Sequence, residues 1–148
     1  MQSYQIFTDG GSRGNPGPAA CAAVIFKQKK KVAELSRSLG KMTNNQAEYH
    51  GVILTFDWLR KNEIKNINVQ FNLDSKLVVE QLSGNFKLKN EGLKPLFWQI
   101  REQTIALGLR LNFKHIPREQ NKEADELVNE TLDKDKKYEI KIKNGEIK

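Results

Sequence analysis

The sequence predicts an α/β fold in which helices cover both faces of a five-stranded mixed sheet. Short segments with alternating apolar residues indicate strands, and longer segments with apolar residues at helical spacing indicate helices. Glycine or proline separates most of these segments. Three expected strands precede the first expected helix, whereas later strands alternate with helices. Short connections favour antiparallel pairs and helical crossovers favour parallel pairs, so the predicted order is β-β-β-α-β-α-α-β-α.

The first three expected strands form an antiparallel meander. They cover residues 3–9, 19–27 and 31–38. A glycine-rich loop follows the first strand, and a lysine-rich hairpin tip joins the second strand to the third. Asp9 is expected at the carboxyl end of the first strand, which is where open α/β sheets usually bind ligands.

The later elements are predicted from apolar spacing and from helix-terminating residues. Apolar residues at helical spacing between Tyr49 and Leu59 predict a long helix, and a period of two between Ile67 and Leu73 predicts a strand. Pro95 lies in the first turn of another helix, and Gly108 ends it. The expected helices cover residues 45–61, 75–82, 92–107 and 119–132, and the expected strands cover residues 66–73 and 109–115.

The remaining tail, residues 133–148, is lysine-rich and is expected to form an extra strand or to be disordered, because Tyr138, Ile140 and Ile142 alternate with polar residues. At 148 residues the chain predicts one domain, which we place at residues 1–132.

Lys and Arg outnumber Asp and Glu by 25 to 18, a basic excess that favours a polyanionic partner. Cys21 is the only cysteine, so an internal disulfide is excluded. Neither a membrane-length apolar run nor a secretory pattern is present, so we expect a cytoplasmic monomer that binds no membrane.

Four acids lie at places where the predicted fold would bring side chains together, namely Asp9, Glu48, Asp74 and Asp125. Each has an ordinary explanation. Asp9 can begin a turn, Glu48 has capping-box spacing from Asn45, Asp74 can cap the next helix, and Asp125 can be a solvated helix residue. If the strands ending at Asp9 and Asp74 are parallel neighbours, however, both acids emerge at the same edge of the sheet.

Converging carboxylates favour a bound cation. Two of them about 4 Å apart repel by roughly 4 kcal/mol at an effective dielectric of 20. Ligand sets made only of oxygen suit Mg²⁺ or Mn²⁺ better than zinc. Two such ions can activate a water and stabilise a leaving oxygen in phosphodiester cleavage. The acids therefore predict a site for two Mg²⁺ ions with substrate, with Mn²⁺ as a substitute.

Four segments resemble the successive motifs of type 1 ribonuclease H. They are DGGSRGNPG at 9–17, TNNQAEY at 43–49, DS at 74–75 and HIPREQNKEAD at 115–125. The resemblance spans residues 1–132 and implies the ribonuclease H-like fold, with a five-stranded mixed sheet. It also implies endonucleolytic hydrolysis of the RNA strand of RNA–DNA hybrids, which leaves 5′-phosphate and 3′-hydroxyl ends.

The resemblance also implies roles for individual residues. Asp9, Glu48, Asp74 and Asp125 match the family's metal-binding catalytic acids, and His115 matches a histidine that assists proton transfer or product release. The matched substrate-binding residues are Gly10, Gly11, Asn15, Thr43, Asn44, Asn45 and Asn121. Amides suit this task because the 2′-hydroxyl of RNA both donates and accepts hydrogen bonds.

The chain departs from some family members between residues 84 and 91, where a basic, tryptophan-bearing handle is absent. Phe86, which precedes Lys87 and Lys89, is either a partial replacement for the handle or a core residue. Two other functions stay open at this point. One is a nuclease of the same fold that acts on double-stranded RNA or on a ribonucleotide in DNA, and the other is a catalytically silent module that binds hybrid.

Overall fold

The computed structural model describes residues 2–143 and contains the predicted order of strands and helices. Its strands are β1 (Ser3–Ser12), β2 (Gly17–Lys27), β3 (Lys30–Met42), β4 (Asn68–Leu73) and β5 (Arg110–His115). Its helices are α1 (Asn44–Lys61), α2 (Lys76–Leu82), α3 (Lys94–Ala106) and α4 (Lys122–Lys143), with a short 3-10 helix at Arg118–Gln120. Within residues 2–143, no helix is both long enough and apolar enough to cross a membrane.

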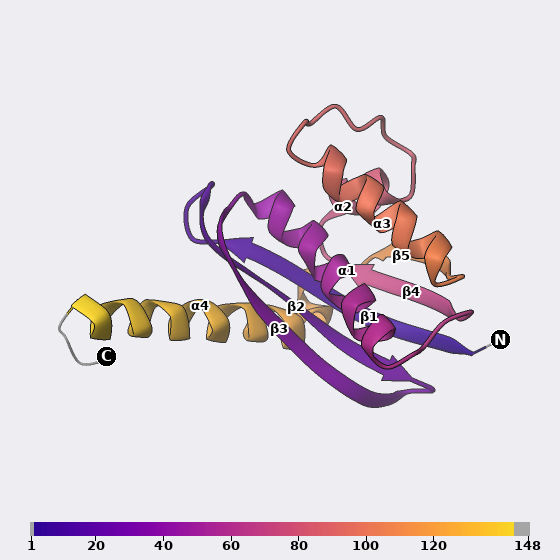
Figure 1. Cartoon of the computed structure of the whole chain (residues 1–148), viewed down its shortest axis with the longest axis horizontal. Helices are drawn as coiled ribbons and strands as arrows, with labels where there is room; N and C mark the ends of the chain where they lie inside the picture. The colour runs from indigo at the N-terminus through magenta and orange to yellow at the C-terminus, as the bar shows by residue number, and fades with distance from the viewer. Residues whose placement is uncertain (1, 144–148) are drawn as a thin grey trace.

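The strands form one five-stranded mixed sheet in the order β3-β2-β1-β4-β5, so β1 is central. β1 pairs antiparallel with β2, and β2 pairs antiparallel with β3. β4 is parallel both to β1 and to β5. The predicted fold class is therefore confirmed (Figure 1).

Helices cover both faces of the sheet, but with different cores. On one face, α1, α2 and α3 enclose a large core that contains Ile6, Ile25, Phe56 and Phe71. On the other face, α4 packs through Val128 and Leu132 on Ala20 and Ala22 of β2. The small alanine side chains let α4 lie close to the sheet.

The first strand is longer than predicted. β1 continues through Asp9 to Ser12, because residues as far as Ser12 still pair with β2. The parallel ladder between β1 and β4 ends earlier, at Phe7 and Asn72. Asp9 thus lies inside a strand, but beyond the last residue of β1 that pairs with β4.

The expected strand in the tail is wrong for the described residues, because α4 continues without interruption to Lys143. No glycine or proline lies between Lys122 and Lys143, so nothing in the sequence stops the helix. Contacts from Asp133 to Arg13 and from Ser38 to Asp135 hold its later turns. The last turns project beyond the strands (Figure 1). Residues 144–148 lie outside the described residues.

Candidate metal centre

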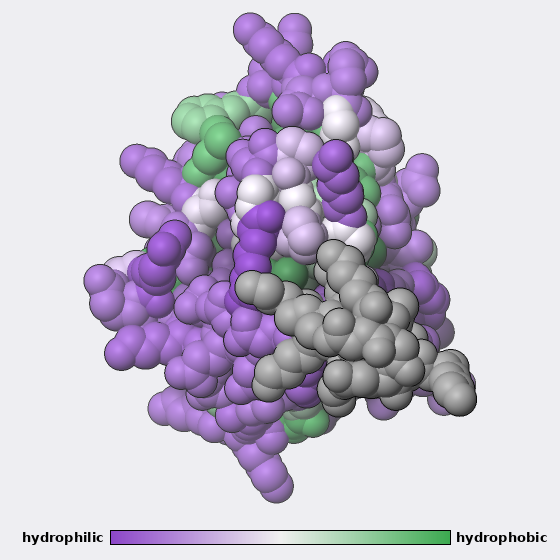
Figure 2. All heavy atoms as spheres, turned by 90° about the vertical axis from the view of Figure 1, so that its left-hand side faces the viewer, coloured by the Kyte–Doolittle hydropathy of each residue, from purple (hydrophilic) through white to green (hydrophobic). Residues whose placement is uncertain are grey.

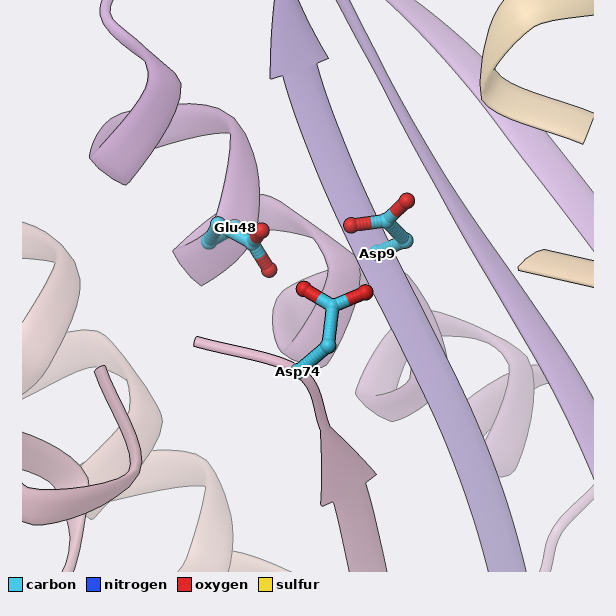
Figure 3. Close-up of side chains that lie close together, drawn as sticks. All are labelled: Asp9, Glu48 and Asp74. Atoms are coloured by element: carbon cyan, nitrogen blue, oxygen red, sulfur yellow. The ribbon is translucent and has the colours of Figure 1, made fainter. Parts of the chain in front are cut away.

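Three acids from separate parts of the chain meet at one edge of the sheet. Asp9 comes from β1, Glu48 from α1, and Asp74 directly follows β4. One carboxylate oxygen from each lies within 4.8 Å of the other two, and Figure 3 shows the three groups turned toward a shared space. Among the described residues, no other group of three acids, histidines or cysteines meets this condition.

Glycine at position 10 lets α1 approach β1 closely enough for Glu48 to meet Asp9. A Cβ atom on Gly10 would collide with the backbone of Ala47 and with the amide nitrogen of Glu48. Any larger residue would therefore push the first turns of α1 away from β1.

The ordinary explanations for Glu48 and Asp74 are both wrong, because other residues cap the two helices. Thr43, not Asn45, begins the capping box of α1: its hydroxyl accepts from the Gln46 N–H at 3.2 Å, and Gln46 Oε1 accepts from the Thr43 N–H at 2.9 Å. Ser75, not Asp74, caps α2, since its hydroxyl accepts from the Val78 N–H at 3.3 Å. Neither Glu48 nor Asp74 serves as a cap, so both are available to the cluster.

Asn121 links the cluster to α4. Its side-chain NH₂ donates to the Thr8 carbonyl at 2.9 Å and to Asp74 Oδ2 at 3.2 Å. Asn121 is only 1% exposed, so in this structure it is a buried residue that holds Asp74 in place. One helical turn later, the N–H of Asp125 donates to the Asn121 carbonyl at 3.1 Å. A single residue therefore connects β1, the end of β4 and the helix that carries Asp125.

Burial and mutual repulsion raise the pKa values of two of the clustered acids. Burial raises the pKa of Asp9 from 3.8 to about 7, and the charge of Asp74 adds to this rise. Burial also holds the pKa of Glu48 well above 4.5, with Asp9 as the second cause. Glu48 Oε2 is buried without a hydrogen-bond partner in the described part of the chain. A cation among these oxygens would remove the repulsion and supply the missing partner.

The acids line a cavity of about 420 Å³ that also contains Asp125. Arg118, from the 3-10 helix, lines the same cavity, and its positive charge opposes the rise in the pKa of Glu48. His115 is exposed at the end of β5 and is not among the lining residues. Sequence reasoning missed this role of Arg118, because the approach of Arg118 to Glu48 depends on the fold.

Asn44 and Asn45 line the cavity, and the glycine-rich loop fixes the orientation of Asn44. The backbone N–H and the hydroxyl of Ser12 both donate to Asn44 Oδ1, at 2.9 and 3.1 Å. Asn15 Oδ1 in turn accepts from the Asn44 N–H at 3.0 Å. The oxygen of the Asn44 amide is thus occupied, whereas its NH₂ group donates to no other group among the described residues and can face a ligand. Sequence reasoning missed the role of Ser12 in orienting Asn44, because the two residues lie 32 positions apart in the sequence.

The connection between α2 and α3 contains no regular helix within the described residues, so the handle is absent as predicted. Phe86 is 50% exposed, which excludes the core interpretation. Leu88, two residues later, packs against the core instead.

Comparisons with known proteins agree with this geometry. Residues 7–131 match the reverse transcriptase-like family. Among solved structures, RNase H1 from the halophilic archaeon Halobacterium salinarum is 34% identical, with a TM-score of 0.82, and the match covers 89% of this chain and 98% of that one. The chain belongs to the type 1 ribonuclease H family. A second ribonuclease H, LC11-RNase H1, was solved in complex with an RNA/DNA hybrid. It is 41% identical to this chain with a TM-score of 0.84, and the match covers 88% of this chain and 97% of that one.

A longer relative also contains a ribonuclease H region. The bifunctional protein Rv2228c of Mycobacterium tuberculosis is 41% identical over 131 residues, which is 86% of this chain but 35% of that protein. This chain therefore spans about a third of that relative's length.

Proposed function

We propose that this protein is a metal-dependent endonuclease that hydrolyses the RNA strand of RNA–DNA hybrids and leaves 5′-phosphate and 3′-hydroxyl ends. The observation that carries the proposal is that the buried acids Asp9 and Glu48 meet the half-buried Asp74 in a cavity that Asp125 also lines. Support for the substrate comes from LC11-RNase H1, a member of the same family that was crystallised with a hybrid.

The donor set fits a hard divalent cation. All three clustered donors are carboxylates, and carboxylate oxygen is the preferred ligand of Mg²⁺ and Mn²⁺. Asp9, Glu48 and Asp74 would hold the metal, with Asp125 as a further ligand on the α4 side. When bound, a pair of such ions supplies an activated water and stabilises the leaving oxygen.

The chain's own groups would bind and orient the substrate around this centre. Asn44 presents its NH₂ group because Ser12 occupies its oxygen. A 2′-hydroxyl oxygen can accept from that NH₂, and a DNA strand offers no such group. Arg118 in the same cavity suits a backbone phosphate, since a guanidinium matches the geometry of phosphate oxygens. His115, which matches the histidine of the family motif, would assist proton transfer in this reaction.

A substrate panel tests the proposal. RNA–DNA hybrid, double-stranded RNA, double-stranded DNA and DNA containing one ribonucleotide are incubated with Mg²⁺, with Mn²⁺ and with a chelator. We expect cleavage of the hybrid alone, with either metal, and end-group analysis should show 5′-phosphates. Asp9→Asn and Asp74→Asn should abolish cleavage, whereas Glu126→Gln, which removes an exposed acid of α4, should not.

Three outcomes would contradict the proposal. Unchanged cleavage by the Asp9 and Asp74 variants would refute the assignment of the site. Preferred cutting of RNA duplex, or of the embedded ribonucleotide, would identify a nuclease of the same fold with another substrate. Binding of hybrid without cutting under either metal would identify a silent binding module.

A further inference from the structure

Arg13 lies at the rim of the cavity that holds the acids, and an acid of α4 pairs with it. Arg13 Nη2 is 2.7 Å from Asp133 Oδ1, with 41% of the arginine side chain and 59% of the aspartate side chain exposed. The same nitrogen donates to the Asn129 carbonyl at 3.5 Å. Arg13 and Asn129 both line the cavity. Apart from the residues drawn in grey, the face of the molecule turned toward the viewer in Figure 2 is mostly hydrophilic.

The backbone of Arg13 is held in place relative to the acids. Its N–H donates to the Pro18 carbonyl at 2.8 Å, and a Cβ atom on Gly17 would collide with the Arg13 carbonyl. The preceding residue, Ser12, is fixed by its two hydrogen bonds to Asn44. The guanidinium therefore projects from a fixed loop at a defined place beside the acid cluster, and only its side chain is free to turn.

We propose that Arg13 binds a backbone phosphate of the hybrid, and that Asp133 occupies Arg13 until the hybrid arrives. This inference rests on the proposed function. Exposed ion pairs contribute little to stability, whereas an arginine fork holds a phosphate through charge-assisted bonds that can be bidentate. Binding thus exchanges a weak pair within the chain for a stronger one with the substrate. Asp133 acts as an internal competitor that weakens hybrid binding.

The exchange does not require α4 to leave the sheet. Two residues beyond Asp133, both carboxylate oxygens of Asp135 accept from the Ser38 hydroxyl, at 2.9 and 2.7 Å. On the inner side of the helix, Val128 and Leu132 stay packed against β2. Only the Arg13 side chain has to turn from one anion to the other.

A double-mutant cycle of binding affinities tests the inference. Hybrid binding is measured in chelator at several salt concentrations, in a cleavage-deficient Asp9→Asn background. We expect Arg13→Gln to weaken binding and to reduce the slope of log affinity against log salt by about one, since one phosphate contact is lost. Asp133→Asn should tighten binding about two- to fivefold, which is the range of an exposed ion pair. With Arg13→Gln already present, Asp133→Asn should have no further effect.

Glu130→Gln is the matched control, because it removes an exposed negative charge one turn earlier on α4. It should tighten binding less than Asp133→Asn does, and equally with and without Arg13. The inference is overturned if Asp133→Asn tightens binding in the Arg13→Gln background, or if Arg13→Gln leaves the salt slope unchanged. In either case the protein would still bind hybrid, so the proposed function would not be refuted. If the protein binds no hybrid at all, the proposed function and this inference are both refuted. Thermal unfolding of each variant verifies that the fold is retained.

Discussion

Replacing Asp9 by asparagine should stabilise the metal-free protein at neutral and alkaline pH, although the same change should abolish cleavage. Asp9 is 6% exposed, and burial raises its pKa from 3.8 to about 7. Asparagine has nearly the same shape and carries no charge. The variant therefore avoids the free-energy cost of ionising a buried carboxyl group beside Glu48 and Asp74.

The size and the pH dependence of the effect follow from the pKa shift. The folded protein keeps the Asp9 proton up to about pH 7, whereas the unfolded chain releases it near pH 3.8. Between these values the folded state binds more protons, so the free energy of unfolding of the wild-type protein falls as pH rises through this window. The shift corresponds to about 4 kcal/mol. Because Glu48 can hold the proton instead, we expect Asp9→Asn to gain about 2–4 kcal/mol at about pH 8, and little at about pH 4.

Urea unfolding in chelator, followed by circular dichroism across this pH range, measures the effect. Glu126→Gln is the control for removing one negative charge from an exposed position of the same protein, and it should change stability little at any pH. The reasoning is refuted if Asp9→Asn is no more stable than the wild type at about pH 8. It is also refuted if the gain has the same size at both ends of the pH range.

Three further predictions concern metal, packing and turnover. Mg²⁺ or Mn²⁺ at ten to a hundred times its dissociation constant should raise the free energy of unfolding of the wild type by about 1–3 kcal/mol, as measured by thermal unfolding, and chelator should reverse this. Glu48→Gln should lose this stabilisation, and retention would argue against metal at Glu48. Gly10→Ala should lower the free energy of unfolding, measured with urea, by about 3 kcal/mol because the added Cβ would collide with α1. Gly11→Ala is the control, because a Cβ at that position has room. Equal losses of stability in the two variants would contradict the packing argument. His115→Ala should lower kcat about a hundredfold and leave measurable cleavage, and a complete loss would mean a more central role.

The sequence was sufficient to predict the order of the elements, and it predicted the meeting of the acids on the condition that the strands ending at Asp9 and Asp74 are parallel neighbours. Strand and helix periods are local properties, whereas the parallel pairing of β1 with β4 is seen only in the folded structure. This pairing brings Asp9 toward Asp74, and the position of Glu48 in the first turns of α1 adds the third acid. The motifs of the ribonuclease H family added the hybrid as the expected substrate.

Helix boundaries and side-chain partners were predicted less well, because they depend on competing local contacts. Thr43 and Ser75 outcompete Asn45 and Asp74 as caps, and a sequence that offers several capping residues in a row does not show which one wins. The extent of α4 was underestimated because alternation of Tyr138 with its neighbours suggested a strand, whereas no residue there stops a helix. Contacts such as Arg13 with Asp133 join residues 120 positions apart in the sequence and follow only from the fold.

The two faces of the sheet are covered by cores of unequal size, so they should differ in their resistance to heat. The side covered by α1 holds large aromatic and branched side chains, while α4 rests on alanines through Val128 and Leu132. An element that buries less apolar area detaches at a lower free energy than the rest of a domain. Since α4 carries Asp125 and begins next to Asn121, warming would abolish the proposed activity while most of the sheet stayed folded. The protein's working temperature would then be set by the attachment of one helix rather than by the melting of the whole domain.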